Sequence, residues 1–171
     1  MPGQGVRELS LSPDGRTLAT VCSDTTTFLW DVASGHLKEK LAKRIGLATT
    51  LAFSSDGRRL AAGNVDNTVR VWDVSTWQLK ATFAGHTEKI SALGFAPHGG
   101  TFATGGYDNT TRVWDLDARQ CRAILNGHSG AVLALDFSPD GQIFATGSHD
   151  ETVRLWYAEG GANKATWTGN L

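Results

Sequence analysis

The sequence has few of the residues that mark disulfide-stabilised or metal-stabilised folds. It contains only two cysteines, Cys22 and Cys121, and neither has a metal-type partner at short spacing. We therefore expect two small, buried or half-buried thiols and a reducing compartment, the cytosol. No His, Cys, Asp or Glu cluster has the spacing of a zinc or calcium site, and no glycine-rich phosphate loop opens a helix. No metal and no cofactor are expected.

Excess charge and long apolar runs are also missing. The 16 basic and 17 acidic residues give a formal net charge of −1, which offers no broad electrostatic reason to bind nucleic acid or an anionic membrane. No apolar run approaches the roughly 18 residues that a membrane-spanning helix needs. The opening residues 1–5, Met-Pro-Gly-Gln-Gly, lack the basic and apolar regions of a signal peptide. Neither a nucleic acid nor a membrane is expected as a partner.

What the sequence does have is an internal repeat. The stretch Ser12-Pro13-Asp14-Gly15 recurs in related form at 54–57, 96–99 and 138–141, each time 42 residues further on. A second marker, an Asp followed six residues later by a Trp, keeps the same step at Asp24 and Trp30, Asp66 and Trp72, Asp108 and Trp114, and Asp150 and Trp156. Two independent markers in phase across four copies indicate a repeat protein that occupies nearly the whole chain.

Each repeat unit is expected to form four short strands. In the third unit the expected strands are 90–95, 101–105, 110–115 and 121–125. Strands of about five residues, separated by turn residues and without a helical stretch, indicate an all-β antiparallel meander. The units are expected at about 3–44, 45–86, 87–128 and 129–171, as one domain.

Two short motifs keep the phase of the repeat. Gly85-His86 and Gly127-His128 precede the third and fourth units, and Trp-Asp closes a strand at 30–31, 72–73 and 114–115. With the 42-residue period, these motifs resemble the WD-repeat family of β-propellers over the entire chain. The resemblance implies that each four-stranded sheet is one blade around a central channel, with its first strand at the channel and its fourth at the rim.

The resemblance also implies a hydrogen-bonded tetrad in each blade: the His of Gly-His, a Ser or Thr on the second strand, the Asp of the next turn and the Trp of the third strand. By position, the complete tetrads are His86, Thr104, Asp108 and Trp114 in the third blade, and His128, Thr146, Asp150 and Trp156 in the fourth. The first blade has Thr20, Asp24 and Trp30, with Pro2 in the place of the His, and the second has Asp66 and Trp72, with Arg44 and Ala62 in the other two places. We expect these two blades to be looser.

The chemistry of the tetrad is expected to be structural. A buried carboxylate and imidazole must be hydrogen-bonded, because an unpaired buried polar group costs free energy. The set suggests a catalytic triad, but it recurs from blade to blade, whereas an active site normally occurs once. The residues expected to face the channel are either Glu8, Thr50, Ala92 and Ala134 or Ser10, Ala52, Gly94 and Asp136. Neither set contains an evident nucleophile–base pair, so we predict that the protein is not an enzyme.

A binding face is expected on the loops between the fourth and first strands and between the second and third strands, as is usual in the family. By position, this face presents Thr87, Glu88, Lys89, Tyr107, Asn109, Ser129, His149 and Glu151. These residues differ between blades while the framework repeats, which suits a recognition surface, although unselected surface drift would look the same. Trp77, in a loop before a rim strand, is a second candidate because exposed aromatic residues are enriched at interfaces.

Four blades raise a packing problem, because each blade buries an apolar face only against a neighbour. WD blades resemble those of seven- and eight-blade rings, and two copies of this chain would supply eight. Gly169-Asn170 occupy the Gly-His phase of a fifth blade, whereas Met1-Pro2 cannot serve in that phase before the first. We therefore predict a homodimer that closes one eight-blade ring. A fragment of a larger natural propeller, or a half-ring completed by a different chain, are the alternatives.

The function expected from these features is that of a non-enzymatic protein-interaction scaffold. It would assemble as a half-propeller into a closed ring and bind a protein or peptide on its loop face. The alternative is a purely structural or designed assembly unit with no native ligand, which the absence of insertions between the repeats also suits.

Overall fold

Turn residues divide the chain into strands of four to six residues, each of which folds back on the one before it. The computed structural model describes residues 5–41, 47–98 and 100–169. The first eight strands are β1 (Val6–Leu11), β2 (Thr17–Cys22), β3 (Thr27–Asp31), β4 (Leu37–Lys40), β5 (Ala48–Phe53), β6 (Arg59–Asn64), β7 (Thr68–Asp73) and β8 (Leu79–Ala84). The second eight are β9 (Ile90–Phe95), β10 (Thr101–Gly106), β11 (Thr111–Asp115), β12 (Gln120–Leu125), β13 (Val132–Phe137), β14 (Ile143–Ser148), β15 (Thr152–Tyr157) and β16 (Asn163–Thr168).

Every four consecutive strands form one antiparallel sheet whose spatial order follows the chain. We call these sheets blades 1 to 4. The predicted all-β architecture of four four-stranded antiparallel sheets is confirmed, and the strands expected in the third unit agree with β9 to β12 within one residue at each end. Within the described part of the chain there is no helix with the length and apolarity needed to cross a membrane.

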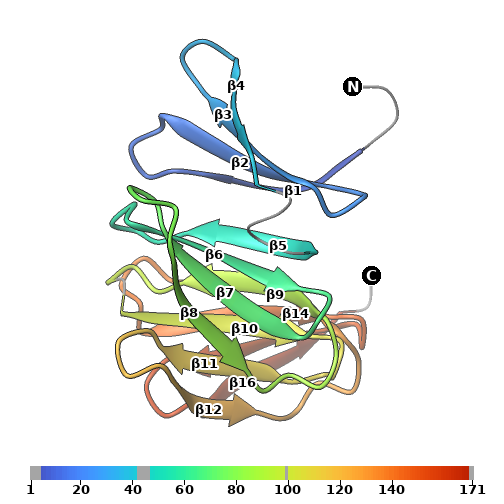
Figure 1. Cartoon of the computed structure of the whole chain (residues 1–171). Coiled ribbons are helices and arrows are strands. Elements are labelled where there is room, and N and C mark those ends of the chain that lie inside the picture. The colour runs from blue at the N-terminus through green and yellow to red at the C-terminus, as the bar shows by residue number, and fades with distance from the viewer. Residues whose placement is uncertain (1–4, 42–46, 99, 170–171) are drawn as a thin grey trace.

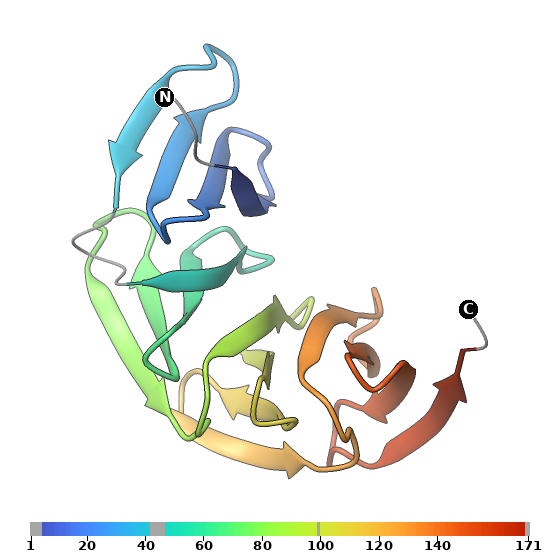
Figure 2. The same cartoon turned by 90° about the vertical axis from the view of Figure 1, so that its right-hand side faces the viewer.

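The blades follow one another along an open arc. Figure 1 shows them from the side, and Figure 2 shows the first strand of each blade on the inside of the arc and the fourth on the outside. The inner strands of neighbouring blades touch: β1 contacts β5, β5 contacts β9, and β9 contacts β13. Blade 1 and blade 4 lie at opposite ends of the arc (Figure 2). Blades 1 and 4 each have a neighbour on one side only.

The apolar core lies between blades. Its three clusters join blade 1 to blade 2, blade 2 to blade 3, and blade 3 to blade 4. In each cluster the Trp of the later blade packs onto aliphatic residues of the earlier blade: Trp72 lies with Leu29, Trp114 with Val71 and Trp156 with Val113. Burial of such side chains contributes about 1.5–3 kcal/mol each, so each blade depends on its neighbour.

The turn between the second and third strands has the same backbone form in every blade. Its third residue has a positive φ: 65° at Thr25, 66° at Asn67, 63° at Asn109 and 63° at Glu151. Each of these residues donates its N–H to the carbonyl three residues earlier, as Asn109 does to Gly106 at 3.3 Å. This turn places the tetrad Asp at the loop end of the blade.

Candidate functional site

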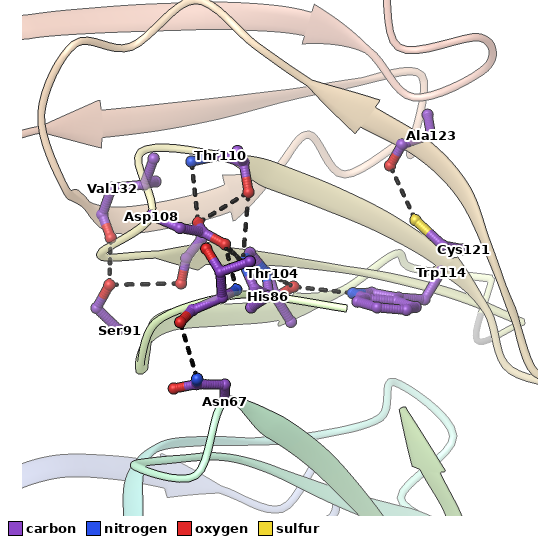
Figure 3. Close-up of polar contacts among 12 residues, drawn as sticks. Asn67, His86, Ser91, Thr104, Asp108, Thr110, Trp114, Cys121, Ala123 and Val132 are labelled. Carbon is purple, nitrogen blue, oxygen red and sulfur yellow. Dashed lines mark hydrogen bonds and ion pairs between the residues drawn. The ribbon is translucent and has the colours of Figure 1, made fainter. Parts of the chain in front are cut away.

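A buried polar network joins two loops and two strands of blade 3. His86 follows β8, Thr104 lies on β10, Asp108 lies in the β10–β11 turn, and Trp114 lies on β11. His86 Nδ1 is 2.8 Å from Asp108 Oδ2, and His86 Nε2 is 2.8 Å from Thr104 Oγ1. Trp114 Nε1 donates to the same threonine oxygen at 2.8 Å. Figure 3 shows His86 held between Asp108 and Thr104, with the Trp114 indole beyond.

The direction of the protons in this network follows from its members. A carboxylate only accepts, so His86 Nδ1 carries the proton that Asp108 receives. His86 Nε2 then accepts the Thr104 hydroxyl proton, and Thr104 Oγ1 accepts the Trp114 N–H. Every polar atom of the imidazole and the indole is thereby satisfied, which is what a buried network requires.

Burial sets the charge states of the pair. Loss of solvent lowers the pKa of His86 below 6.5 by more than the adjacent Asp108 raises it. Burial acts to raise the pKa of Asp108, but hydrogen bonds from the Thr87 N–H, the Thr110 hydroxyl and His86 outweigh it and hold that pKa below 3.8. At neutral pH the network therefore contains a neutral imidazole and a carboxylate.

Blade 4 repeats the arrangement. His128 Nδ1 lies 2.9 Å from Asp150 Oδ2, and His128 Nε2 lies 2.8 Å from Thr146 Oγ1. Trp156 Nε1 donates to Thr146 at 2.8 Å. Burial acts to raise the pKa of Asp150, but hydrogen bonds from Thr152, the Ser129 N–H and His128 hold it well below its ordinary value. The same chemistry twice in one chain favours a structural role over a catalytic one.

Blades 1 and 2 hold their turn carboxylates differently. Trp30 Nε1 donates to Thr20 at 3.0 Å, and Thr26 donates to Asp24 through both its N–H and its hydroxyl. In blade 2, Arg70 Nη2 lies 2.6 Å from Asp66 Oδ2. Ala62 offers Trp72 no hydroxyl. Pro2 and Arg44, which stand at the histidine position in the sequence, lie outside the described residues.

Sequence reasoning overlooked a fifth member of the network. A threonine two residues after each turn Asp donates its hydroxyl to that carboxylate, at 2.8 Å for Thr26, 2.6 Å for Thr68, 2.8 Å for Thr110 and 2.7 Å for Thr152. The signal was available, because these threonines keep the 42-residue step in all four blades. Each one fixes the turn carboxylate of its blade, and in blades 3 and 4 that carboxylate also accepts from the histidine.

The residues predicted for the binding face gather where these loops meet. Thr87 and Ser129 donate their backbone N–H groups to Asp108 and Asp150, at 3.0 and 2.9 Å, so they also anchor the loops. Asn109 and Glu151 hold the positive-φ turn positions. The side chains of this face are exposed at Thr87, Glu88, Tyr107, Ser129, His149 and Glu151 and half-buried at Lys89 and Asn109.

Two of these residues form a direct pair. The Lys89 ammonium lies 3.8 Å from the centre of the Tyr107 ring, and the Tyr107 N–H donates to the Lys89 carbonyl. The equivalent pair in blade 2 is Leu47 and Val65, joined by the same backbone bond, and both side chains are exposed. Sequence reasoning missed this apolar pair, although the 42-residue step from Lys89 and Tyr107 leads to it.

Neighbouring blades are also linked across this face. The Asn67 amide in blade 2 donates to the Thr87 carbonyl in blade 3 at 3.0 Å. Figure 3 shows Asn67 reaching up from the neighbouring blade to this loop. The pairs Leu47–Val65 and Lys89–Tyr107 therefore lie on linked loops of two neighbouring blades, and we call the four residues together the loop patch.

Trp77 does not serve as a free aromatic residue. Its ring is partly buried and packs on the cluster between blades 1 and 2, so Trp77 is not the exposed aromatic residue that its loop position suggested. Trp167, by contrast, is one of the exposed large apolar residues. Cys22 is buried and Cys121 half-buried, both as free thiols.

The inner face of the arc carries little chemistry. Glu8, Thr50, Ala92 and Ala134 line one cavity there of about 210 Å³. Burial raises the pKa of Glu8 above 4.5. Among the residues the structure describes, no three His, Cys, Asp or Glu side chains come together as a metal site. The geometry as a whole is that of a WD-type propeller segment with structural tetrads.

Comparison with known proteins assigns the family. The sequence matches the family described as WD domain, G-beta repeat, over residues 1–31, 35–73, 77–115 and 119–157. The chain belongs to this WD40 repeat family. Each of the last three matched segments begins before one blade's fourth strand and ends with the next blade's third strand, so the sequence repeat is offset by one strand from the blade.

The fold also has a close structural counterpart. The structure entitled "Crystal structure of RRP9 WD40 repeats" superposes with a TM-score of 0.88 at 26% sequence identity. The match covers 99% of this chain and 52% of that one, so this chain spans about half the length of that structure. The search of curated protein sequences returned no match.

Proposed function

We propose that this chain is a non-enzymatic interaction scaffold whose blades hold the loop patch as a binding surface for a protein or peptide. WD40 domains typically bind proteins or peptides and generally lack enzymatic activity. The observation that carries the proposal is the loop patch itself, where blade 2 exposes Leu47 and Val65 and blade 3 exposes Tyr107 with the Lys89 ammonium over its ring. Aromatic and apolar side chains on a rigid frame gain contact area at little cost in conformational entropy.

The composition of the patch favours one kind of ligand. Leu47 and Val65 supply apolar area, and Lys89 supplies a positive charge beside the Tyr107 ring. An extended peptide with apolar side chains and a nearby carboxylate complements these groups. His149, on blade 4, would contact a longer peptide.

A peptide-display selection on the immobilised chain tests this part of the proposal. Selected peptides should bind the unaltered chain saturably and lose at least about tenfold in affinity to Tyr107→Ala, because aromatic anchors commonly contribute 2 kcal/mol or more. Asp117→Ala, at the opposite ends of the strands, is the matched control and should bind as well as the unaltered chain. Failure to select any peptide that depends on Tyr107 would contradict the proposal.

We also propose that a second copy of the chain closes the arc into one eight-blade ring. Blades 1 and 4 each present an apolar sheet face, and large exposed apolar faces are rare on soluble proteins. Exposed side chains on these blades include Val6, Leu9 and Leu11 at one end and Leu133, Val153 and Trp167 at the other. Class averages from electron microscopy should show closed rings, and open arcs would count against a second copy as the cover.

A further inference from the structure

The uncovered face of blade 1 carries the kind of apolar side chains that are buried between blades elsewhere in the arc. Val6 is 58% exposed, whereas the residues at the same repeat position, Ala48, Ile90 and Val132, are fully buried. Leu9 is likewise exposed while its equivalent in blade 2, Leu51, is buried. The side chains therefore suit an interface of the kind that blades 2, 3 and 4 already form.

The uncovered face of blade 4 also exposes a side chain whose equivalents in the other blades are buried. Trp167 is 57% exposed, whereas Leu41, Phe83 and Leu125 at the same repeat position are at most 5% exposed. Phe83 meets the Trp114 ring of the next blade with centroids 5.5 Å apart. Trp167 lacks the equivalent ring, which would be that of Trp30.

On the inner side of the second and third junctions, a glycine of one blade faces a branched side chain of the next blade. A β-carbon added to Gly63 would lie 2.5 Å from Ile90 Cγ2, and one added to Gly105 would lie 2.4 Å from Val132 Cγ1. Each glycine is thus a socket that a branched side chain of the next blade fills.

The first junction keeps this pairing with the sizes exchanged. Val21 stands at the socket position of blade 1, and the residue at the entering position of blade 2 is Ala48. Both are buried in the same cluster. One large and one small residue therefore meet at every junction, whichever blade carries the large one.

Blade 4 has an empty socket of the same kind. The residue at this position is Gly147, and among the described residues the nearest atom that an added β-carbon would meet is Ala134 Cβ at 3.7 Å. We infer that the Gly147 socket of one chain receives Val6 of a second copy, and that this contact sets the head-to-tail register of the ring. The inference rests on the proposed closure by a second copy and specifies its interface.

A second contact between neighbouring blades lies near the rim. Near the rim, Trp77 packs on the cluster that contains Leu41, and Gly161 lies so close to Leu125 that an added β-carbon would be 2.2 Å from its Cδ2. The corresponding pair at the closing junction is Trp167 with Gly35 of the second copy. A β-carbon added to Gly35 meets nothing within 4 Å in the described residues, which leaves room for the largest side chain in the series.

Polar groups at the junctions fit the same register. The Thr49 hydroxyl donates to the Ile90 carbonyl of the next blade, and the Ser91 hydroxyl donates to the Val132 carbonyl of the next blade. The equivalent residue in blade 4 is Leu133, which has no hydroxyl to donate. At the first junction the acceptor is instead Ser10 Oγ, which receives the Phe53 N–H at 3.1 Å. Asp136 stands at the Ser10 position in blade 4, so its carboxylate is placed to receive the Leu11 N–H of the second copy.

Filling the socket tests the inference. Gly147→Val should weaken self-association roughly 10- to 100-fold, because overpacking a tight contact is strongly unfavourable. The single chain should still fold, since Gly147 lies on a strand without positive φ and an added β-carbon would meet Ala134 Cβ at 3.7 Å, an ordinary van der Waals contact. Circular dichroism checks the fold, and sedimentation velocity measures association. Gly100→Val, at a position where an added β-carbon meets nothing within 4 Å among the described residues, is the matched control and should associate normally.

The decisive variant combines Gly147→Val with Val6→Ala. This pair recreates at the closing junction the sizes that Val21 and Ala48 have at the first junction, so it should restore association to within a few-fold of the unaltered chain. If the unaltered chain associates and the Gly147→Val variant associates equally well, this register is wrong, while closure by a second copy still holds. A Gly147→Val defect that Val6→Ala does not relieve would also overturn it. A wild-type chain that stays single overturns both.

Discussion

Thr25 shows most plainly how the repeat constrains a single residue. It occupies a turn position with φ 65°, a conformation that β-branched residues rarely adopt. In blades 2 and 3 the same position is taken by Asn67 and Asn109, and asparagine tolerates the left-handed region far better. The Thr25 hydroxyl donates to the adjacent Asp24 carbonyl, a contact within the turn itself.

Thr25→Asn should therefore stabilise the protein by about 0.5–1 kcal/mol. The midpoint of urea unfolding measures the change. The reciprocal variant Asn109→Thr places a branched side chain in the same backbone conformation and should lower the midpoint. A loss of stability on Thr25→Asn would show that the turn does not strain this residue.

The lowered pKa of His86 predicts the direction in which the stability of the fold changes with pH. The unfolded chain protonates this histidine near its ordinary pKa of 6.5, whereas the folded chain does so only at lower pH, because its folded pKa is lowered. The unfolded state then binds more protons, so stability is full above about pH 6.5 and falls as the pH drops towards the folded pKa. Asp108, with a folded pKa below 3.8, adds a second loss in stronger acid.

Thermal midpoints measured between pH 8 and pH 5 test this sign. The unaltered chain should lose stability towards pH 5, and His86→Gln, which keeps a hydrogen-bonding group but does not titrate, should show a shallower dependence. Equal slopes for the two proteins would mean that His86 is not shifted in the direction stated here.

At the scale of the element, Thr104 stabilises blade 3 by joining the loop that carries His86 to the strand that carries Trp114. Its hydroxyl donates to His86 and accepts from Trp114. Thr104→Val keeps the shape but leaves one buried donor and one buried acceptor unpaired, and should cost about 1–3 kcal/mol.

Thr20→Val in blade 1 is the matched comparison. Thr20 accepts from Trp30, and Trp30 is less buried than its counterparts, so water can replace the lost partner. Chemical denaturation should show a smaller loss for Thr20→Val than for Thr104→Val. Equal losses would contradict the view that the His86 network stabilises blade 3 beyond a single hydrogen bond.

The element scale also shows how far the sequence alone can lead. Strand positions follow from the period, because each unit must present its apolar residues and turns in the same phase. The network threonines, such as Thr110, were visible in the same period and were overlooked. The packing of Trp77 was not predictable in this way, because it depends on a cluster that joins two blades, and the other units have Gly35, Arg119 and Gly161 at the same repeat position.

At the scale of the whole molecule, the stability of the arc depends on what covers the two end faces. The interior junctions pair a large residue with a small one, and the ends carry an unmatched Val6 and an unmatched Gly147. Repeat proteins gain stability from each added neighbour, so closure should stabilise blades 1 and 4 most. The period predicted four blades, but the match between the two ends became visible only when exposure could be compared at equivalent positions.

The most direct test of the central claim is the mass of the 171-residue chain in solution, measured by light scattering at micromolar concentration. A closed ring of eight blades should give a single species of twice 18.3 kDa, the mass of one chain. A stable species of 18.3 kDa would contradict it, as would a series of growing open assemblies.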